Sequence, residues 1–249
     1  MRRSGCWNGC GVSMRGNGGD LGMQLSIVMP VLNEAAGIDA MLLRLAPLRR
    51  DGAQLIVVDG GSDDGTAALA APHADIVLSS PRGRALQMHA GALAASGDAL
   101  LFLHADTVLP PRAGELIAQA LRSRAWGRFD VALDADGPAY RMIAAMMNLR
   151  SRLTSIATGD QAIFMRRAFY QAAGGFPPLA LMEDIAFCKR ARQLARPACL
   201  RDRVVTSARR WEKNGVWRTV FLMWRLRLAY FLGADTDTLA YRYGYRRKP

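Results

Sequence analysis

The sequence predicts an α/β fold with a Rossmann-like, mostly parallel central sheet flanked by helices. Short apolar runs without polar alternation are typical of strands that are covered on both faces. These runs alternate along the chain with helical patterns, which is the order found in parallel sheets joined by crossover helices. A length of 249 residues and a hydrophobic content of 51% are enough for one large domain with a buried core.

The order of the elements follows from where these patterns fall. Apolar runs at 25–31, 55–58, 76–78 and 100–103 are expected to be strands. Helical patterns lie at 37–48, 66–71, 85–95 and 112–122. The last of them follows Pro110 and Pro111, which favour a helix start. Beyond residue 124 we expect a strand at 129–133, a Met-rich helix around 140–156 and a further segment of the same domain at 159–184.

Three segments are expected along the chain. Residues 1–22 contain seven glycines and lack the apolar stretch of a signal peptide. They are predicted to be a disordered leader or a mis-assigned start, because Met23 directly precedes the first strand. Residues 23–212 are expected to form the main domain, and residues 213–249 a basic, aromatic, helical extension.

Charge and cysteine content limit the possible partners and the cellular compartment of the protein. The formal net charge of +12 favours anionic partners, which leaves nucleoside diphosphates, nucleic acid and acidic membrane surfaces as alternatives. The four cysteines form neither a repeated C-x-x-C pair nor a dense framework. They therefore predict reduced thiols in a cytoplasmic protein.

The residues that follow each strand are the candidates for a binding site, because ligands of such sheets bind beyond the carboxyl ends of the strands. In this chain they are mostly polar, acidic or glycine. The candidates are Pro30, Asn33 and Glu34 after the first strand, Asp59, Gly61 and Ser62 after the second, Arg84 and Gln87 after the third, and His104 and Asp106 after the fourth. We expect them to meet at one edge of the sheet.

Asp59 opens a glycine-rich turn at 60–66. Carboxylate oxygens accept hydrogen bonds from the N–H and hydroxyl groups of a base and a ribose, and glycines let a ligand approach the backbone. The alternative is a solvated turn that caps the next helix, because Ser, Asp and Thr are all common caps.

Asp106 and Arg84 have the chemistry to hold a diphosphate. A hard divalent cation on a diphosphate uses one or two protein carboxylates and takes its other ligands from phosphate oxygens and water, and Asp106 fits that role. A guanidinium such as that of Arg84 pairs with phosphate oxygens. The alternatives are a helix cap for Asp106 and a solvated basic loop for Arg84, and Gln87 is a weaker candidate.

Glu183 and Asp184 open an apolar-periodic helix behind the glycine- and proline-rich segment 174–178. Either could be a general base, because an attacking hydroxyl must lose its proton and a positioned carboxylate can accept it. The structural alternative is that acidic residues in a first turn interact favourably with the helix dipole. Adjacent residues of a helix point about 100° apart, so one of the two must dominate.

Four motifs, taken together and in order, resemble the family 2 glycosyltransferases with the GT-A fold. They are 30–34, 58–66, 104–106 and 183–184, and the resemblance covers roughly residues 24–212. Within that family the chain is most similar to a subgroup often labelled as arsenosugar-biosynthesis glycosyltransferases. The motifs of the subgroup add the candidates Gly159, Asp160, Arg209, Arg210 and Trp211.

The resemblance implies an inverting transfer from a nucleotide sugar. Asp59 would hold the base, Asp106 would bind manganese or magnesium, and Asp184 would deprotonate the acceptor. The nucleotide pocket would be lined by Pro30, Asn33 and Glu34, with Arg84 facing ribose or phosphate.

Two positions depart from the family pattern. The second acid that commonly follows the nucleotide-binding Asp is Gly60 here, and the first acid of the usual D-x-D metal motif is His104. Asp106 would therefore bind the cation with fewer protein carboxylates than is usual.

Three other functions compete with this interpretation. Residues 62–66 approximate the D-x-D-G-T signature of haloacid dehalogenases, but Ser62 stands at the nucleophile position. A nucleotidyltransferase should show a glycine-rich basic loop after the first strand, where this chain has 33–37. A nucleic-acid-binding module would suit the net charge, but acidic residues at the strand ends would repel phosphate, so no nucleic acid partner is expected.

The segment 216–232 combines aromatic residues with Arg218, Arg225 and Arg227. Three arginines are too costly for a spanning helix, whereas a helix in the membrane interface tolerates them. The segment predicts a peripheral contact at the inner membrane face, with ordinary packing against the main domain as the alternative.

Overall fold

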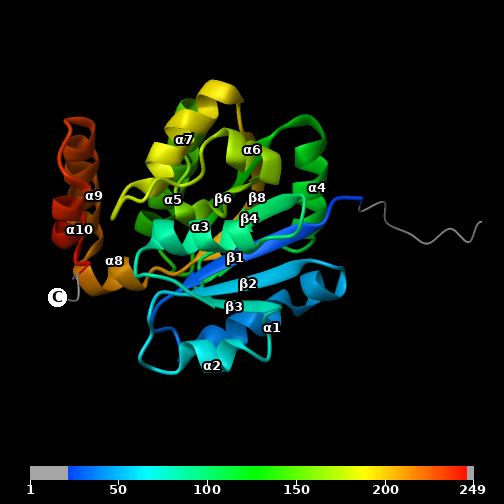
Figure 1. Ribbon diagram of the computed structural model, residues 1–249. Coiled ribbons are helices and arrows are strands. Elements are labelled where there is room, and N and C mark those ends of the chain that lie inside the picture. Colours follow the sequence, from blue (N-terminus) through cyan, green and yellow to red (C-terminus); the bar gives the residue numbers. More distant parts are fainter. Residues whose placement is uncertain (1–21, 246–249) are drawn as a thin grey trace, which may run out of the picture.

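The computed structural model of the protein describes residues 22–245, in which the strands form one eight-stranded sheet (Figure 1). The predicted leader, Cys6 and Cys10, and the end of the basic tail lie outside the described residues. The strands are β1 (Leu25–Val31), β2 (Gln54–Asp59), β3 (Ile76–Ser79), β4 (Ala99–Phe102), β5 (Thr107–Val108), β6 (Trp126–Leu133), β7 (Phe164–Arg166) and β8 (Ala198–Thr206).

The sheet is parallel in its first half and mixed in its second. The strand order is β3-β2-β1-β4-β7-β6-β8-β5. β3, β2, β1 and β4 pair in parallel, β7 is antiparallel to both β4 and β6, and β8 is parallel to β6. The predicted α/β class with a mostly parallel sheet is confirmed.

Helices cover both faces of the sheet. They are α1 (Ile38–Arg50), α2 (Thr66–Ala70), α3 (Arg84–Ala94), α4 (Ala113–Ser123), α5 (Pro138–Thr154), the 3-10 helix η1 (Gly159–Gln161), α6 (Arg167–Ala172), α7 (Glu183–Leu194), α8 (Arg209–Asn214), α9 (Val216–Phe231) and α10 (Thr236–Tyr243). Helices α1, α2 and α4 contribute to the core on one face, and α3, α6 and α7 to the core on the other.

Strand β1 shows how one sheet supports two cores. Successive side chains of a strand point to opposite faces, so Val28 lies in the core with α3 whereas Ile27 and Met29 lie in the core with α1. All three are fully buried. This explains why the strand is a continuous apolar run in the sequence rather than an alternating one.

Strands β7 and β8 were not expected from the sequence. β8 carries exposed polar residues at 201–203, so it lacks the continuous apolar run that marks the first four strands. β7 has only three residues, too few to show a period. The parallel pairing of β6 with β8 spans Gly127 to Leu133, so β6 also begins before the predicted 129.

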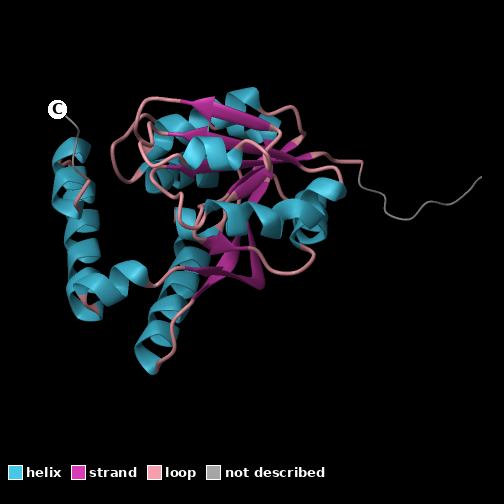
Figure 2. Ribbon diagram, turned by 90° about the horizontal axis from the view of Figure 1, so that it is seen from below, coloured by secondary structure: helices cyan, strands magenta, loops and turns pink. Residues whose placement is uncertain are grey.

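The C-terminal helices lie at one side of the molecule (Figures 1 and 2). Their packing is partly with the main domain, because Leu226 of α9 and Leu239 of α10 are buried in the core that contains α3 and α7. The extension therefore folds against the domain before it. Over the described residues, no helix has the length and apolar character needed to cross a membrane.

Candidate active site

Asp59 ends β2 and organises the turn that follows it. Its carboxylate accepts hydrogen bonds from the backbone N–H groups of Gly61 (3.0 Å) and Ser62 (2.9 Å) and from the hydroxyl of Ser62. The side chain is buried. A carboxylate offers about four acceptor positions, so Asp59 retains capacity for one donor from a ligand.

The loops after β1 and β2 are tied together by side chains. Asn33 has φ +54°, a left-handed conformation that Asn tolerates better than most residues. Its N–H donates to the Ser62 hydroxyl (2.9 Å), and its side-chain oxygen accepts from the N–H of Asp63 (3.0 Å). The Glu34 N–H donates to the Thr66 hydroxyl (2.9 Å). The two strand ends therefore form one preorganised surface, which Pro30 borders within β1 opposite Val58.

Gln87 has a structural place beneath this surface. Its side-chain N–H₂ donates to the carbonyl oxygens of Val31 (2.7 Å) and Val58 (2.8 Å), and the residue is buried. A Cβ at Gly60 would lie 2.9 Å from the Gln87 side chain. Gln87 therefore holds the ends of β1 and β2, and an acid in place of Gly60 would require the Gln87 side chain to shift.

Asp106 lies in the open, just beyond β4. It is exposed, and the hydroxyl of Thr107 lies 3.4 Å from one of its oxygens. Burial raises the pKa of Glu34; the charge of Arg209 acts to lower it, and the charges of Asp106 and Asp64 act to raise it further. Asp106 and Glu34 are thus close enough to repel each other, which favours a cation between them and a bound diphosphate.

No cluster of three or more His, Cys, Asp or Glu side chains capable of holding a metal occurs among residues 22–245. A cation would therefore depend on Asp106 and on oxygens of the diphosphate, a ligand set that magnesium and manganese accept. The residues fit a metal that arrives with its nucleotide rather than one held in a cage of protein ligands.

The side chain of His104 faces η1 and not Asp106. Its Nδ1 lies 3.5 Å from Asp160 Oδ1, and its buried Nε2 lacks a hydrogen-bond partner. A Cβ at Gly159 would lie 2.4 Å from this Nε2, so only glycine fits beside the ring. His104 therefore packs against Gly159 at the position of the first acid of the family's D-x-D motif.

Glu183 and Asp184 begin α7 and differ in exposure. Glu183 is buried, whereas Asp184 is half-buried and accepts hydrogen bonds from the N–H groups of Gly159 (3.1 Å) and Ile185 (2.7 Å). Burial and the adjacent charge of Asp184 raise the pKa of Glu183 to about 7. Both carboxylates are at the site, and Asp184 is the one that a ligand can reach.

Arg84 and Asp160 connect the two halves of the site. The phenolic group of Tyr245 and then the carboxylates of Glu183 and Asp160 raise the pKa of Arg84. Burial acts to raise the pKa of Asp160, but His104, Arg84 and Arg227 together hold it below its ordinary value. The Asp160 side chain still exposes 44% of its surface, so it faces solvent within the site.

Helix α8 begins beside the loop that follows β1. Arg209 Nη2 is 3.8 Å from Glu34 Oε2. The guanidinium of Arg210 lies over the ring of Tyr243 at 3.9 Å and donates to the Tyr243 carbonyl oxygen (3.3 Å). Trp211 is half-buried. Helix α8 thus joins the strand ends to α10.

Two arginines that the sequence did not single out as site residues also lie here. The charges of Asp184 and Asp160 act on the pKa values of both Arg150, from α5, and Arg227, from α9. Arg227 was expected at a membrane surface with Arg218 and Arg225, but it faces the site while those two are exposed. The only sign of this in the sequence was helical geometry. Successive residues of a helix are spaced 100° apart around its axis, so Arg227 points in a different direction from Arg225.

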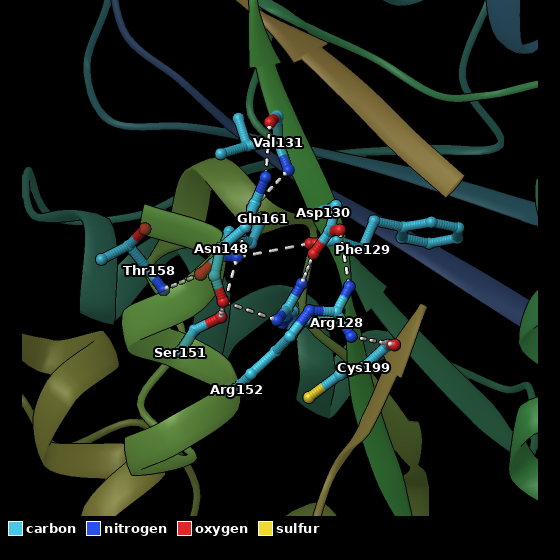
Figure 3. Close-up of polar contacts among 10 residues, drawn as sticks. All are labelled: Arg128, Phe129, Asp130, Val131, Asn148, Ser151, Arg152, Thr158, Gln161 and Cys199. Atoms are coloured by element: carbon cyan, nitrogen blue, oxygen red, sulfur yellow. Dashed lines mark hydrogen bonds and ion pairs between the residues drawn. The ribbon is translucent and has the colours of Figure 1, made fainter. Parts of the chain in front are cut away.

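A buried polar network fixes η1 and α5 against β6 (Figure 3). Asp130 accepts hydrogen bonds from Arg128 and from Arg152 (2.6 Å). The side chain of Asn148 pairs with both the N–H (2.9 Å) and the carbonyl (3.0 Å) of Val131. Gln161 of η1 donates to a hydroxyl of α5 (3.1 Å). By fixing η1 against α5 and β6, this network positions Gly159 and Asp160.

The sheet and the carboxylates at its strand ends define an α/β protein with a candidate ligand site at the sheet edge. Residues 26–173 match the profile described as Glycosyl transferase family 2. Because the match covers more than half of the chain, the chain belongs to glycosyl transferase family 2.

Curated relatives match only part of the chain. Uncharacterized glycosyltransferases of Mycobacterium tuberculosis (strain ATCC 25618 / H37Rv) and Mycobacterium bovis (strain ATCC BAA-935 / AF2122/97) are 36% identical over 86 residues. The match spans 34% of this chain and 38% of each relative.

Solved structures share the fold. A mannosyltransferase from Pyrobaculum calidifontis, in complex with GDP-Man and Mn2+, superimposes with a TM-score of 0.62 at 21% identity, covering 90% of this chain and 69% of that one. Residues 1–349 of TarS from S. aureus give a TM-score of 0.58 at 20% identity, covering 74% and 60%. These similarities confirm the predicted GT-A fold.

Proposed function

We propose that the protein transfers a sugar from a uridine or guanosine diphosphate sugar to a hydroxyl group of an acceptor, with inversion at the anomeric carbon. The observation that carries the proposal is the convergence of Asp59, Asp106, Arg84 and Asp184 around one edge of the sheet. TarS is known in complex with UDP and with UDP-GlcNAc, and the Pyrobaculum enzyme with GDP-Man, which supports a nucleotide-sugar donor.

The donor pocket is assigned to the loops after β1 and β2. Asp59 has acceptor capacity left for an N–H group of the base or a hydroxyl of the ribose, and Asn33 with Ser62 sets the shape of the floor. Arg84 is assigned to the diphosphate, because a guanidinium pairs with phosphate oxygens from two donors at once.

Asp184 is assigned as the general base. The acceptor oxygen forms a bond to the anomeric carbon while the bond from that carbon to the diphosphate oxygen breaks, and the hydroxyl proton passes to the Asp184 carboxylate. A single displacement inverts the anomeric centre and needs no covalent intermediate. Glu183 is buried beneath it and is assigned a supporting role.

A divalent cation, manganese or magnesium, is assigned to Asp106. Bound there, the cation would offset the charge that develops on the leaving diphosphate. The Pyrobaculum enzyme is known with Mn2+, and the exposed Asp106 beside Glu34 supports a similar requirement in this chain.

The proposed donor and metal can be tested together by a hydrolysis screen. Several uridine and guanosine diphosphate sugars are incubated with the protein, with and without Mn2+, and the released nucleotide is measured. We expect release from at least one donor that depends on Mn2+, and Asp106→Ala should abolish the Mn2+ enhancement of diphosphate binding measured by calorimetry. Asp98→Ala, at the opposite end of β4, is the matched control. Tight diphosphate binding by Asp106→Ala that Mn2+ enhances as in the parent would contradict the metal assignment.

The acceptor is assigned only by resemblance. The subgroup motifs at 103–107, 159–161 and 209–211 support an arsenosugar-type pathway as the proposed setting. The nucleotidyltransferase, dehalogenase and nucleic-acid-binding alternatives receive no support from the site.

We further propose that the protein is cytoplasmic and that α9 contacts the inner face of the membrane. Trp217, Phe221, Trp224 and Leu228 form one stripe and each exposes more than half of its surface. Arg218 and Arg225 are exposed beside them. Aromatic residues flanked by arginines suit the interface of an anionic bilayer, where the rings enter the headgroup region and the cations pair with lipid phosphates.

This contact should be visible by sedimentation with vesicles. We expect the protein to sediment with phosphatidylserine-containing vesicles at low salt and the double variant Phe221→Ser, Trp224→Ser to stay in the supernatant. Leu43→Ser, which changes a comparably exposed apolar residue of α1, should sediment like the parent. A parent protein left wholly in the supernatant would rule the contact out.

A further inference from the structure

A groove runs between α3 on one side and α6, the segment 174–178 and Arg190 of α7 on the other. These helices cover the same face of the sheet (Figure 1). The groove, here called the α3–α6 groove, consists of two cavities of about 280 Å³ and about 330 Å³. His89 and Gly174 line both cavities, so the two meet there. The size is that of a small-molecule site, for which about 300–1,000 Å³ is usual.

Two consecutive glycines form the middle of the groove. Gly174 and Gly175 have φ +74° and +61°, left-handed conformations that residues other than glycine rarely adopt. A Cβ at Gly174 would lie 3.1 Å from Arg190 Nη1, and a Cβ at Gly175 would lie 3.2 Å from His89 Nδ1. The glycines therefore leave open a space that Arg190 and His89 border.

Arg190 has hydrogen-bond donors left for a ligand. It is half-buried and donates from Nη2 to the carbonyl oxygen of Gly175. Within residues 22–245 its Nε and Nη1 make no hydrogen bond, and its side chain forms no ion pair. A guanidinium pairs with a carboxylate through two parallel hydrogen bonds. Arg190 is therefore an unpaired cation beside a cavity.

The His89 ring offers a further donor. Its Nδ1 lies 3.1 Å from the hydroxyl oxygen of Tyr170, which is buried and accepts a hydrogen bond from the Phe176 N–H (3.1 Å). Burial raises the pKa of Tyr170 to about 12, so the hydroxyl keeps its proton and donates it to Nδ1. The neutral ring then carries its own proton on Nε2. This Nε2 makes no hydrogen bond within the described part of the chain, so it can donate to a ligand.

The groove also has apolar walls and no negative charge. Leu86, Pro177 and Pro178 line one cavity, and Leu93 lines the other. Among the described residues that line the groove there is no Asp or Glu, and none is assigned to the donor, the cation or the base. Arg167, beside Leu93, likewise forms no ion pair within residues 22–245. The electrostatic field in the groove therefore favours an anion.

We propose that the α3–α6 groove is a second binding site, separate from the nucleotide site, for a carboxylate attached to an apolar chain. Arg190 and the Nε2–H of His89 bind the carboxylate, and the apolar walls remove the chain from water. One guanidinium and one neutral donor match the single charge of a carboxylate. They match less well a phosphate monoester, which carries about −1.5 to −2 charges at pH 7.

Calorimetry with octanoate tests the site in the full chain. Octanoate is titrated with and without UDP and Mn2+, and with and without GDP and Mn2+. We expect octanoate to bind the parent under all these conditions, because the nucleotide occupies a different site. Octylammonium has the same chain with the opposite charge, and acetate has the charge without the chain. Each should bind about tenfold more weakly, or worse.

Arg190→Gln should bind octanoate about tenfold more weakly, or worse, because a charge-assisted hydrogen bond is lost. Arg192→Gln is the matched control. Arg192 is also on α7 and also donates to a backbone carbonyl oxygen (3.0 Å), but it does not line the groove.

Leu93→Glu tests the groove without disturbing the core, because Leu93 is 73% exposed. The substitution places a negative charge in the groove and should also weaken octanoate binding. Leu43→Glu makes the same change at an exposed position of α1 and should bind as the parent does. This pair decides the question even if Arg190→Gln melts at a lower temperature than the parent.

The inference is wrong if the parent does not bind octanoate, or if octylammonium binds as tightly. It is also wrong if Arg190→Gln and Leu93→Glu bind octanoate as their controls do. Loss of octanoate binding on addition of nucleotide would assign the anion to the donor site instead. If neither nucleotide binds while octanoate still requires Arg190, the proposed donor fails and the second site stands.

Discussion

Asp184→Asn should bind the donor as the parent does and lose about 10²–10⁴ in transfer rate, the usual effect of removing a general base. The amide oxygen of Asn can still accept the hydrogen bond that the Gly159 N–H now gives to Asp184. The fold and the position of η1 should therefore be kept. The measurements are the melting temperature, the donor affinity and the rate of sugar transfer to acceptor, with the rate of donor hydrolysis as a check on the donor pocket.

Glu183→Gln is the matched control for that experiment. It changes the adjacent carboxylate, which is buried, and it should retain much more of the transfer rate. Transfer by Asp184→Asn within a few-fold of the parent would place the base elsewhere.

Glu183→Gln should itself change how stability depends on pH. The pKa of Glu183 is raised from 4.5 to about 7 in the folded protein, so the folded state binds a proton more tightly than the unfolded state between these values. The contribution of Glu183 to stability therefore falls as pH rises through this window and is lowest above pH 7. A neutral glutamine removes this loss, and the variant should gain up to about 3 kcal/mol at pH 8 and nothing at pH 4.

Chemical denaturation of parent and variant at pH 4, 6 and 8 measures this effect. Glu115→Gln provides the comparison, because Glu115 also lies in a first helical turn but is exposed and its pKa is lowered, mainly by Arg112. Its variant should show a small change of opposite sign. A Glu183→Gln variant less stable than the parent at pH 8 would show that the charged form of Glu183 is needed by the fold.

The sequence was a good guide to the parallel half of the fold. Strands with apolar residues on both faces, such as β1 (Leu25–Val31), stand out in the sequence because both sides are covered. The polar residues after them were predicted to meet at one edge, and the loops of Asn33 and Asp59 do meet there. Strand β8 escaped prediction because its exposed residues interrupt the apolar pattern.

The arginines near Asp184 could not be predicted in the same way. Arg150 and Arg227 come from helices far apart in the chain, and each sequence neighbourhood is typical of an ordinary amphipathic helix. Their shared position depends on how α5 and α9 pack, which is a tertiary property. The same holds for Gln87, whose burial between two strand ends is invisible in the pattern of α3.

Gly159 connects His104 to Asp184. Its N–H donates a hydrogen bond to Asp184 (3.1 Å), and the ring of His104 occupies the space that a Cβ at this position would need. A donor that restricts the motion of His104 would also restrict the motion of Asp184. Binding of the acceptor would then cost less conformational entropy. By thermodynamic reciprocity the acceptor would tighten the donor by the same factor, so a three-residue turn would make the two substrates bind cooperatively without fixing which of them binds first.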